Sequence, residues 1–390
     1  MSSNKVQQWF PWTEAPVIVN APMAGAASPE LAAEVTKAGG LGFLGCIADV
    51  SENSPQIAKL DADLTKVRQL LGSSATTTTT TPPSGHLHVG AGFLTCHPSI
   101  TNFAATALPI IRKHKPAAVW LFAPHEHIRP QGEIVRLLKG LGREHGEEAM
   151  APPRVFVQVG NVAAAREAIA DGADAVVCQG TDAGGHQFRR GMGVVPLLGE
   201  TRRVVDEGGY GEGVCVLAAG GIADGKAVAA MLTLEADAVV LGTRFTVAKE
   251  SIVPDFRKQI ILEASDGAVS TLKSPFNDDI ADSDLWGSLY DGRAVVGPIH
   301  EKFLAGASLD ECRRGLREEH SPEEAARLIN TWATFLYDLF VRAVIFGADG
   351  LGFVRGAAIG LVRKEQPAGE IVGEVREEAK QAIRKVAARV

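Results

Sequence analysis

The chain has 390 residues, of which 46% are hydrophobic and 22% charged, and its formal net charge at pH 7 is −7. This composition is ordinary for a folded globular protein, and the negative charge argues against a nucleic-acid partner. No apolar run approaches the twenty or so residues of a membrane span. The five cysteines are widely spaced and form no Cys-x-x-Cys pair, which indicates neither a disulfide framework nor a structural zinc site. Since no targeting signal is recognisable, the cytoplasm is the default expectation for its location.

Eight short apolar runs predict β-strands, and stretches compatible with helices lie between them. The runs are nearly continuous in apolar residues, as is typical of strands buried on both faces. This repetition predicts an α/β fold, a (β/α)8 TIM barrel, in preference to an open sheet. The predicted strands are Val17–Asn20, Leu41–Gly45, Leu87–Phe93, Ala117–Phe122, Arg154–Val159, Ala173–Gln179, Val214–Ala218 and Ala236–Leu241.

Capping residues mark several of the predicted helices. Ser28 precedes a proline at the first helical position, and two glycines at 39 and 40 end that helix. Asn161 and Asp224 cap two further helices, each after a predicted strand. The order strand, cap and helix is the order of a βα unit.

After the eighth predicted strand the chain continues for about 150 residues, more than one closing helix needs. We therefore expect a barrel unit over residues 10–265 and a C-terminal, mainly helical extension over residues 266–390. The extension is expected to pack on or near the barrel mouth, either as a separate domain or as one domain with the barrel. Within it, Glu323–Phe346 is a helical candidate, Gly347–Gly356 a glycine-rich passage near the mouth, and Glu370–Val390 a charged surface helix. The threonine tract Thr76–Thr81 predicts a surface loop before the third strand.

Glycines gather at the ends of the seventh and eighth predicted strands, where barrels place their functional residues. The seventh is followed by Ala219, Gly220 and Gly221, and the eighth by Gly242 and Thr243. Glycine lets backbone N–H groups approach phosphate oxygens, and a helix N-terminus adds a favourable dipole. These two strand ends therefore predict a phosphate-binding site, with the threonine hydroxyl as a further donor.

The first strand is followed by Ala21-Pro22-Met23-Ala24-Gly25, which lets backbone approach a flat ligand or serves as a simple turn. The sixth is followed by Gln179-Gly180-Thr181-Asp182-Ala183-Gly184-Gly185-His186. His186 comes after a double glycine in a loop that faces the predicted phosphate site. Its imidazole can remove a proton from an acidic carbon or, when charged, stabilise an anion. Gln179 can hydrogen-bond the edge of a cofactor or serve in packing.

Three other patterns are given no catalytic role. Gly40–Gly45 matches the G-x-G-x-x-G string of dinucleotide folds, but it follows a helix and forms a strand, so the match is attributed to chance. His125-Glu126-His127 follows the fourth strand without a second ligand cluster, and no metal is expected. His86 and His88 are interpreted as solvated.

In their order and placement, these strings resemble the nitronate monooxygenases, formerly called 2-nitropropane dioxygenases, a family of FMN-dependent barrels. The resemblance runs from about Ala15 to Phe245 and continues more weakly through Tyr290–Ala294. It implies oxidation of alkyl nitronates, and of nitroalkanes after deprotonation, by O2 to a carbonyl compound and nitrite through a flavin semiquinone. His186 would be the catalytic base. The implied FMN contacts are Pro22, Met23, Ala24, Gln158, Gln179, Gly180, Ala219, Gly220, Gly221, Gly242, Thr243, Arg244 and Phe245.

Other functions remain open on the same residues. The nearest is an NAD(P)H-dependent quinone or enoyl reductase on the same FMN barrel. A phosphate-ligand barrel without flavin, such as an isomerase or aldolase, is a second, and a non-enzymatic binding module is a third. The expected partners are a small nitronate or nitroalkane and O2, with no nucleic acid and no membrane, in a monomer or homodimer.

Overall fold

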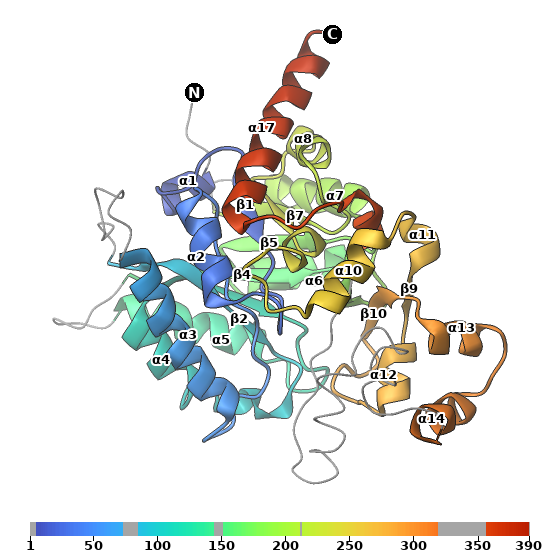
Figure 1. The fold of residues 1–390 in the computed structure, drawn as a ribbon. Helices are drawn as coiled ribbons and strands as arrows, with labels where there is room; N and C mark the ends of the chain where they lie inside the picture. The colour runs from blue at the N-terminus through green and yellow to red at the C-terminus, as the bar shows by residue number, and fades with distance from the viewer. Residues whose placement is uncertain (1–4, 73–84, 144–150, 211–212, 319–355, 390) are drawn as a thin grey trace.

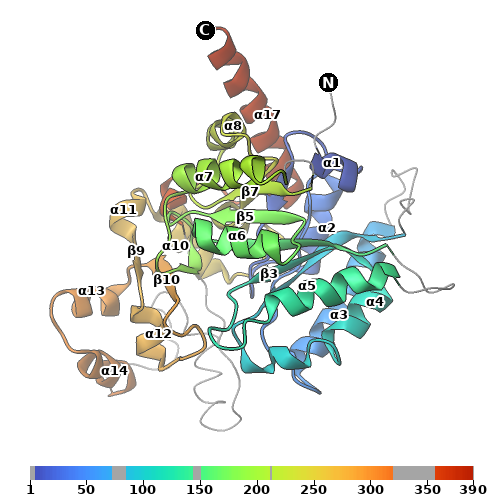
Figure 2. The same ribbon diagram turned by 180° about the vertical axis from the view of Figure 1, so that it is seen from behind.

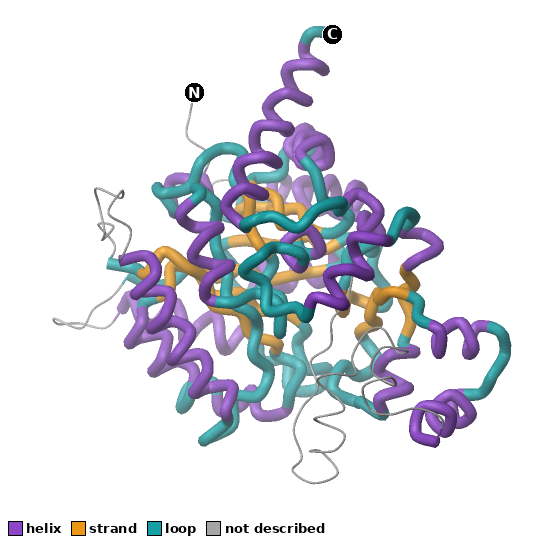
Figure 3. Tube along the Cα trace, viewed as in Figure 1, coloured by secondary structure: helices purple, strands orange, loops and turns teal. Residues whose placement is uncertain are grey.

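The computed structural model describes residues 5–72, 85–143, 151–210, 213–318 and 356–389. Seven parallel strands form one curved sheet in the order β1–β8–β7–β5–β4–β3–β2, with helices around it (Figures 1 and 2). Figure 3 shows the same arrangement, with the strands at the centre of the molecule. The strands are β1 Ile18–Asn20, β2 Leu87–Leu94, β3 Pro116–Phe122, β4 Arg154–Val159, β5 Ala175–Gln179, β7 Cys215–Ala219 and β8 Ala238–Leu241.

Residues 41–47 close the ring between β1 and β2. Leu41 bridges Val19 of β1, while Phe43 and Ile47 bridge residues of β2. The predicted strand Leu41–Gly45 is thus present as isolated bridges and not as a regular strand. The physical reason lies in Asn20, whose side chain bonds both the backbone N–H and the carbonyl of Phe43 at 2.8 Å. The backbone N–H and carbonyl of Phe43 therefore do not bond to the backbone of a neighbouring strand. Residues 41–47 nevertheless bridge β1 and β2 and close the barrel.

Helices follow the strands and cover the outside of the barrel. The predicted caps at Ser28, Asn161 and Asp224 each accept a hydrogen bond from the first turn, at 2.8–3.0 Å. Apolar residues of these helices pack against one face of the strands, and Phe43, Trp120 and other strand residues fill the interior. The helices are α2 Pro29–Lys37, α3 Pro55–Gly72, α4 Ala107–His114, α5 Gln131–Gly140, α6 Val162–Ala170, α7 Val194–Glu207 and α8 Gly225–Thr233, with α1 Lys5–Trp9 before β1.

The outer helix next to β8 comes from the end of the chain. Helix α17, Ala368–Ala387, packs against α8 and α2 and completes the outer layer (Figure 1). Its predicted character as a charged surface helix holds for one face only, because Ile371, Val372 and Val375 are buried. Buried Arg376 donates to the carbonyls of residues 38 and 39 at 2.9 and 2.8 Å.

Between β8 and α17 lies a long insertion. Its strands β9, Thr271–Ser274, and β10, Tyr290–Val295, form a second sheet with β6, Gly185–Phe188, in the antiparallel order β6–β10–β9. The mainly helical character of the extension is confirmed, whereas this sheet was not predicted. The other elements are α9 Thr243–Thr246, α10 Asp255–Glu263, α11 Gly267–Ser270, α12 Phe276–Ala281, α13 Pro298–Leu304, α14 Leu309–Glu318 and η3 Ala357–Leu361, and the short turns η1 Pro98–Asn102 and η2 Leu141–Arg143 lie in the barrel.

Several expectations fall outside the described residues, namely the helix Glu323–Phe346, the tract Thr76–Thr81 and residues 347–355. The division at residue 265 stays a prediction, as do the cytoplasmic location and the choice between monomer and homodimer. In the described part of the chain, no helix combines the length and the apolar character needed to cross a membrane.

Candidate active site

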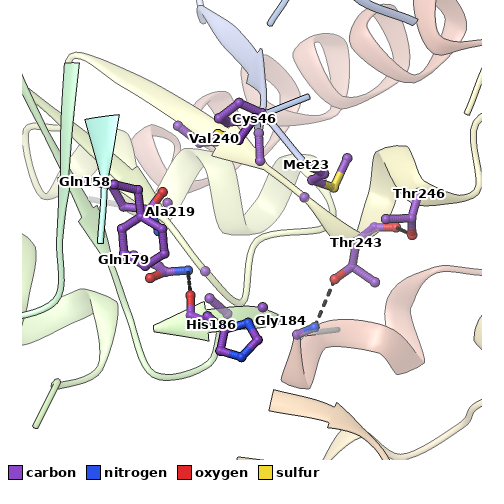
Figure 4. A pocket seen from close by; sticks show the side chains of 18 of the residues that line it. Met23, Cys46, Gln158, Gln179, Gly184, His186, Ala219, Val240, Thr243 and Thr246 are labelled. Carbon is purple, nitrogen blue, oxygen red and sulfur yellow. Dashed lines mark hydrogen bonds between the residues drawn. The ribbon is translucent and has the colours of Figure 1, made fainter. Parts of the chain in front are cut away.

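A cavity opens at the carboxyl ends of the barrel strands and encloses about 1110 Å³ of empty space, part of it open to solvent (Figure 4). Apolar side chains such as Leu94, Phe122 and Trp286 line it beside glycine-rich backbone. Most of the residues implicated by the sequence meet on its wall. They are Pro22, Met23, Ala24, Gln158, Gln179, His186, Ala219, Gly220, Gly221, Gly242 and Thr243.

Three implicated residues lie elsewhere. The N–H of Gly180 donates to the carbonyl of residue 219 at 2.9 Å, and a side chain there would strike the backbone of α7. Phe245 is fully buried in the apolar core. Arg244 donates to the carbonyl of Lys364 at 3.3 Å and to the side chain of Gln366. None of these three residues lines the cavity, and their contact with a cofactor stays a prediction.

His186 lies in β6 and not in a free loop, because Gly292 of β10 pairs with it. It is buried, yet it borders the cavity. Its Nε2 lies 3.0 Å from each carboxylate oxygen of Asp278 in α12. Its ring stacks on Trp286, with centroids 3.6 Å apart and planes inclined by 7°. The imidazole is thus held at one edge and on one face.

Asp278 and Trp286 were not identified from the sequence. Each lies about a hundred residues beyond His186, and no spacing rule links positions so far apart. Only the pairing of β6 with β10, which brings the insertion onto the barrel mouth, places them together. The weak resemblance at Tyr290–Ala294, which is most of β10, was the one available signal that this region belongs to the site.

Two glutamine side chains stand on the cavity wall. Gln179 donates from Nε2 to the backbone carbonyl of His186 at 3.1 Å, as Figure 4 shows. Its Oε1 is buried and has no hydrogen-bond partner among the described residues. Gln158 accepts a hydrogen bond at Oε1 from Trp120, at 3.0 Å. Since a buried, unpaired acceptor is costly, the Oε1 atom of Gln179 calls for a donor from a bound molecule.

The strand ends of β7 and β8 form the opposite part of the wall. Gly220 and Gly221 have φ values of +95° and +72°, and a Cβ at either would lie within 3.0 Å of the loop 180–183. No hydrogen bond within the described residues is donated by the N–H of Gly221 or Thr243. The Thr243 hydroxyl accepts from the N–H of Gly356 at 2.9 Å, so the end of the glycine-rich segment does reach the mouth. This end of the cavity therefore offers free backbone donors to an anion.

His125, Glu126 and His127 line a neighbouring cavity that shares Trp286 with the first one. The Nδ1 of His125 accepts from two backbone N–H groups at 3.3 Å, and the carboxylate of Glu126 accepts from Ser288. No cluster of three or more candidate metal ligands occurs in the part of the chain that the structure describes.

The expectation that His86 and His88 are both solvated is only partly met. His88 is half-buried and stacks on Trp12 at 4.0 Å. This burial lowers the pKa of His88 to about 4.

A family model described as nitronate monooxygenase matches residues 146–281. A nitronate monooxygenase of Neurospora crassa is 40% identical to this chain over 98% of its length and 94% of the relative's. The chain belongs to the nitronate monooxygenase family. A member of this family from Metarhizium robertsii is 34% identical over 97% of this chain and 95% of its own.

Two solved structures share the fold. FabK from Thermotoga maritima superposes on this chain with a TM-score of 0.67 at 24% sequence identity. The superposition covers 100% of each chain. A nitroalkane oxidase from Streptomyces ansochromogenes gives a TM-score of 0.62 at 23% identity over 98% of this chain and 99% of its own. At such identities the likeness confirms the predicted fold alone. Family membership, in contrast, makes this chain an oxidoreductase.

Proposed function

We propose that this chain is an FMN-dependent nitronate monooxygenase. It oxidises alkyl nitronates with O2 to a carbonyl compound and nitrite, and it accepts nitroalkanes by deprotonating them first. The observation that carries the proposal is the buried His186 on the wall of a cavity whose opposite end is lined with glycine backbone. This combination offers a proton acceptor beside a place for a phosphorylated cofactor.

The residues on the cavity wall fit FMN. The unpaired Oε1 of Gln179 is an acceptor for a ring N–H, which an isoalloxazine has. The free N–H groups of Gly221 and Thr243 suit phosphate oxygens. The backbone of Pro22, Met23 and Ala24, without bulky polar groups, suits the flat ring system. When bound, FMN supplies the electron transfer and the reaction with O2.

The protein's own share is binding, proton transfer and exclusion of water. With a neutral nitroalkane, His186 takes the proton from the carbon that carries the nitro group, and the electron pair of the broken C–H bond moves onto the nitro group to give a nitronate. A nitronate supplied as such needs no proton removal, and the imidazole then only contacts the anion. Apolar walls at Leu94, Phe122 and Trp286 limit the access of water to this reaction.

Stopped-flow mixing separates this function from an NAD(P)H-dependent reductase on the same scaffold. The holoenzyme is mixed anaerobically with a nitronate or with NADH, and the flavin absorbance is followed. We expect rapid bleaching by the nitronate and none by NADH. Bleaching by NADH with an inert nitronate would refute the proposal. A colourless protein that takes up no added FMN would favour an isomerase or aldolase barrel without flavin.

A further inference from the structure

The contact between His186 and Asp278 decides which ring nitrogen is available for chemistry. Both carboxylate oxygens of Asp278 lie 3.0 Å from Nε2 of the imidazole. A carboxylate only accepts hydrogen bonds, so the nitrogen that faces it must carry a proton. In a neutral imidazole the lone pair then resides on the other nitrogen, Nδ1. The second nitrogen is therefore the atom that is able to accept a proton from a substrate.

The surroundings of Asp278 hold it in this place. It lies in the first turn of α12 and is buried. On the other face of that helix, Phe276 and Ile280 pack against Ile299 of α13 and Cys312 of α14 in a separate apolar cluster. Trp286 follows α12 and covers one face of the imidazole. The helices of the insertion thus anchor Asp278, whereas Trp286 packs beside Phe122 and Tyr290 in the cluster that fills the barrel interior.

We infer that Asp278 is a positioning residue that keeps the Nε2–H of His186 directed to itself, so that the neutral ring carries its lone pair on Nδ1, the nitrogen that takes the proton when His186 acts as the base. Trp286 holds the plane of the ring. The inference rests on the proposed role of His186 as the base. In the proton transfer, the C–H bond of the nitroalkane breaks, Nδ1 gains the proton, and the electron pair moves onto the nitro group. The carboxylate of Asp278 stabilises the imidazolium that forms.

The tautomer is measured directly by nitrogen NMR of the holoenzyme labelled with ¹⁵N-histidine. The His186 signal is assigned by its loss in His186→Asn. We expect a ring protonated at Nε2 and bare at Nδ1 at the assay pH. A ring protonated at Nδ1 only, or at both nitrogens, would overturn the inference. Since this reading needs no turnover, it stays informative even if nitronates prove not to be substrates.

The variant Asp278→Asn tests the consequence for catalysis. Asn can donate to Nε2, so the ring is no longer held in one tautomer. We expect kcat for a neutral nitroalkane to fall by about 100-fold or more, with a smaller change in KM. Turnover of the pre-formed nitronate and the FMN content should change little. Equal losses on both substrates at full FMN content would contradict the positioning role.

Asp279→Asn is the matched control, since it makes the same change one residue further along α12. Asp279 is exposed, and the two hydrogen-bond distances at the imidazole Nε2 are to Asp278. It should keep both the tautomer and the ratio of nitroalkane to nitronate turnover. If Asp279→Asn lowered the ratio as strongly as Asp278→Asn, a general effect of charge would replace the proposed hydrogen bond. Asp278→Glu, which keeps an acceptor, should restore part of the ratio.

Discussion

At the scale of single residues, the candidate site contains an imidazole that is proposed to react and separate side chains that hold it in place. His186 is the one imidazole in the described part of the main cavity wall, and its neighbours Asp278 and Trp286 restrain its edge and its face. The glutamines and glycines around it carry no charge. Proton transfer by this histidine is consequently separable from cofactor binding, and the two are open to separate tests.

Replacing His186 with Asn tests its role as base. The side chain stays polar and of similar size, so FMN should remain bound. Turnover of a neutral nitroalkane should fall by about 100-fold or more, the usual share of a general base. Turnover of the pre-formed nitronate should fall much less, because its carbon is already deprotonated. The measurement is nitrite release from both substrates, and equal losses would remove the assignment.

Gly221→Ala tests the phosphate end of the cavity. Its φ of +72° strains any side chain, and a Cβ would lie 2.9 Å from the Cβ of Asp182. We expect the dissociation constant of FMN to rise by about tenfold or more, equivalent to about 1.4 kcal/mol. Gly209→Ala is the control, because Gly209 has a φ of +71° but open space around it. Fluorescence titration of the apoprotein with FMN should show no change for Gly209→Ala, and an unchanged Gly221→Ala would contradict the assignment.

Parts of this site were predictable from the sequence because local chain chemistry encodes them. Double glycines after buried strands mark Gly220 and Gly221, and the position of His186 after Gly184 and Gly185 marks the histidine. Asp278 carried no such mark, since its role depends on a contact across 92 residues of chain. Residues that act through distant pairing have no local pattern to reveal them.

At the scale of elements, buried strands and capped helices were predicted well. The runs of apolar residues and the capping residues that mark them are local features of the sequence. Leu41–Gly45 departed from a regular strand because the side chain of Asn20 competes for its backbone groups. Strands β9 and β10 were missed for a different reason. β10 pairs with β6 and β9 pairs with β10, and the pairing of β10 with β6 is a tertiary contact that local sequence patterns do not reveal.

The contact between helices α8 and α17 is tested by a substitution at Gly225. A Cβ on Gly225 would lie 2.4 Å from the backbone nitrogen of Ala379, so Gly225→Ala must push the two helices apart. We expect a loss of about 1–3 kcal/mol in the free energy of unfolding, as for other overpacked contacts. Thermal or urea unfolding measures it.

Gly373→Ala, within α17 itself, provides the comparison. Nothing lies within 4 Å of a Cβ placed there. Alanine should therefore stabilise the protein by up to about 1 kcal/mol, through helix propensity alone. If Gly225→Ala were as stable as Gly373→Ala, α17 would not be packed against α8 as described.

At the scale of the whole molecule, the insertion between β8 and α17 connects the candidate active site to the barrel. Its strands extend from β6, which carries His186, and its helix α12 supplies Asp278. The last helix then returns to the barrel between α8 and α2. The barrel could be inferred from the repeated βα pattern, whereas the contribution of the insertion to the site could not.

The central claim, oxidation of a nitronate at this cavity, is tested most directly by nitrite release. The FMN-loaded enzyme is supplied with an alkyl nitronate in air, and nitrite, carbonyl product and O2 consumption are measured together. We expect nitrite and carbonyl compound in equal amounts, with O2 consumed and no requirement for NAD(P)H. No nitrite from any nitronate of a short-chain panel, with FMN bound, would contradict it.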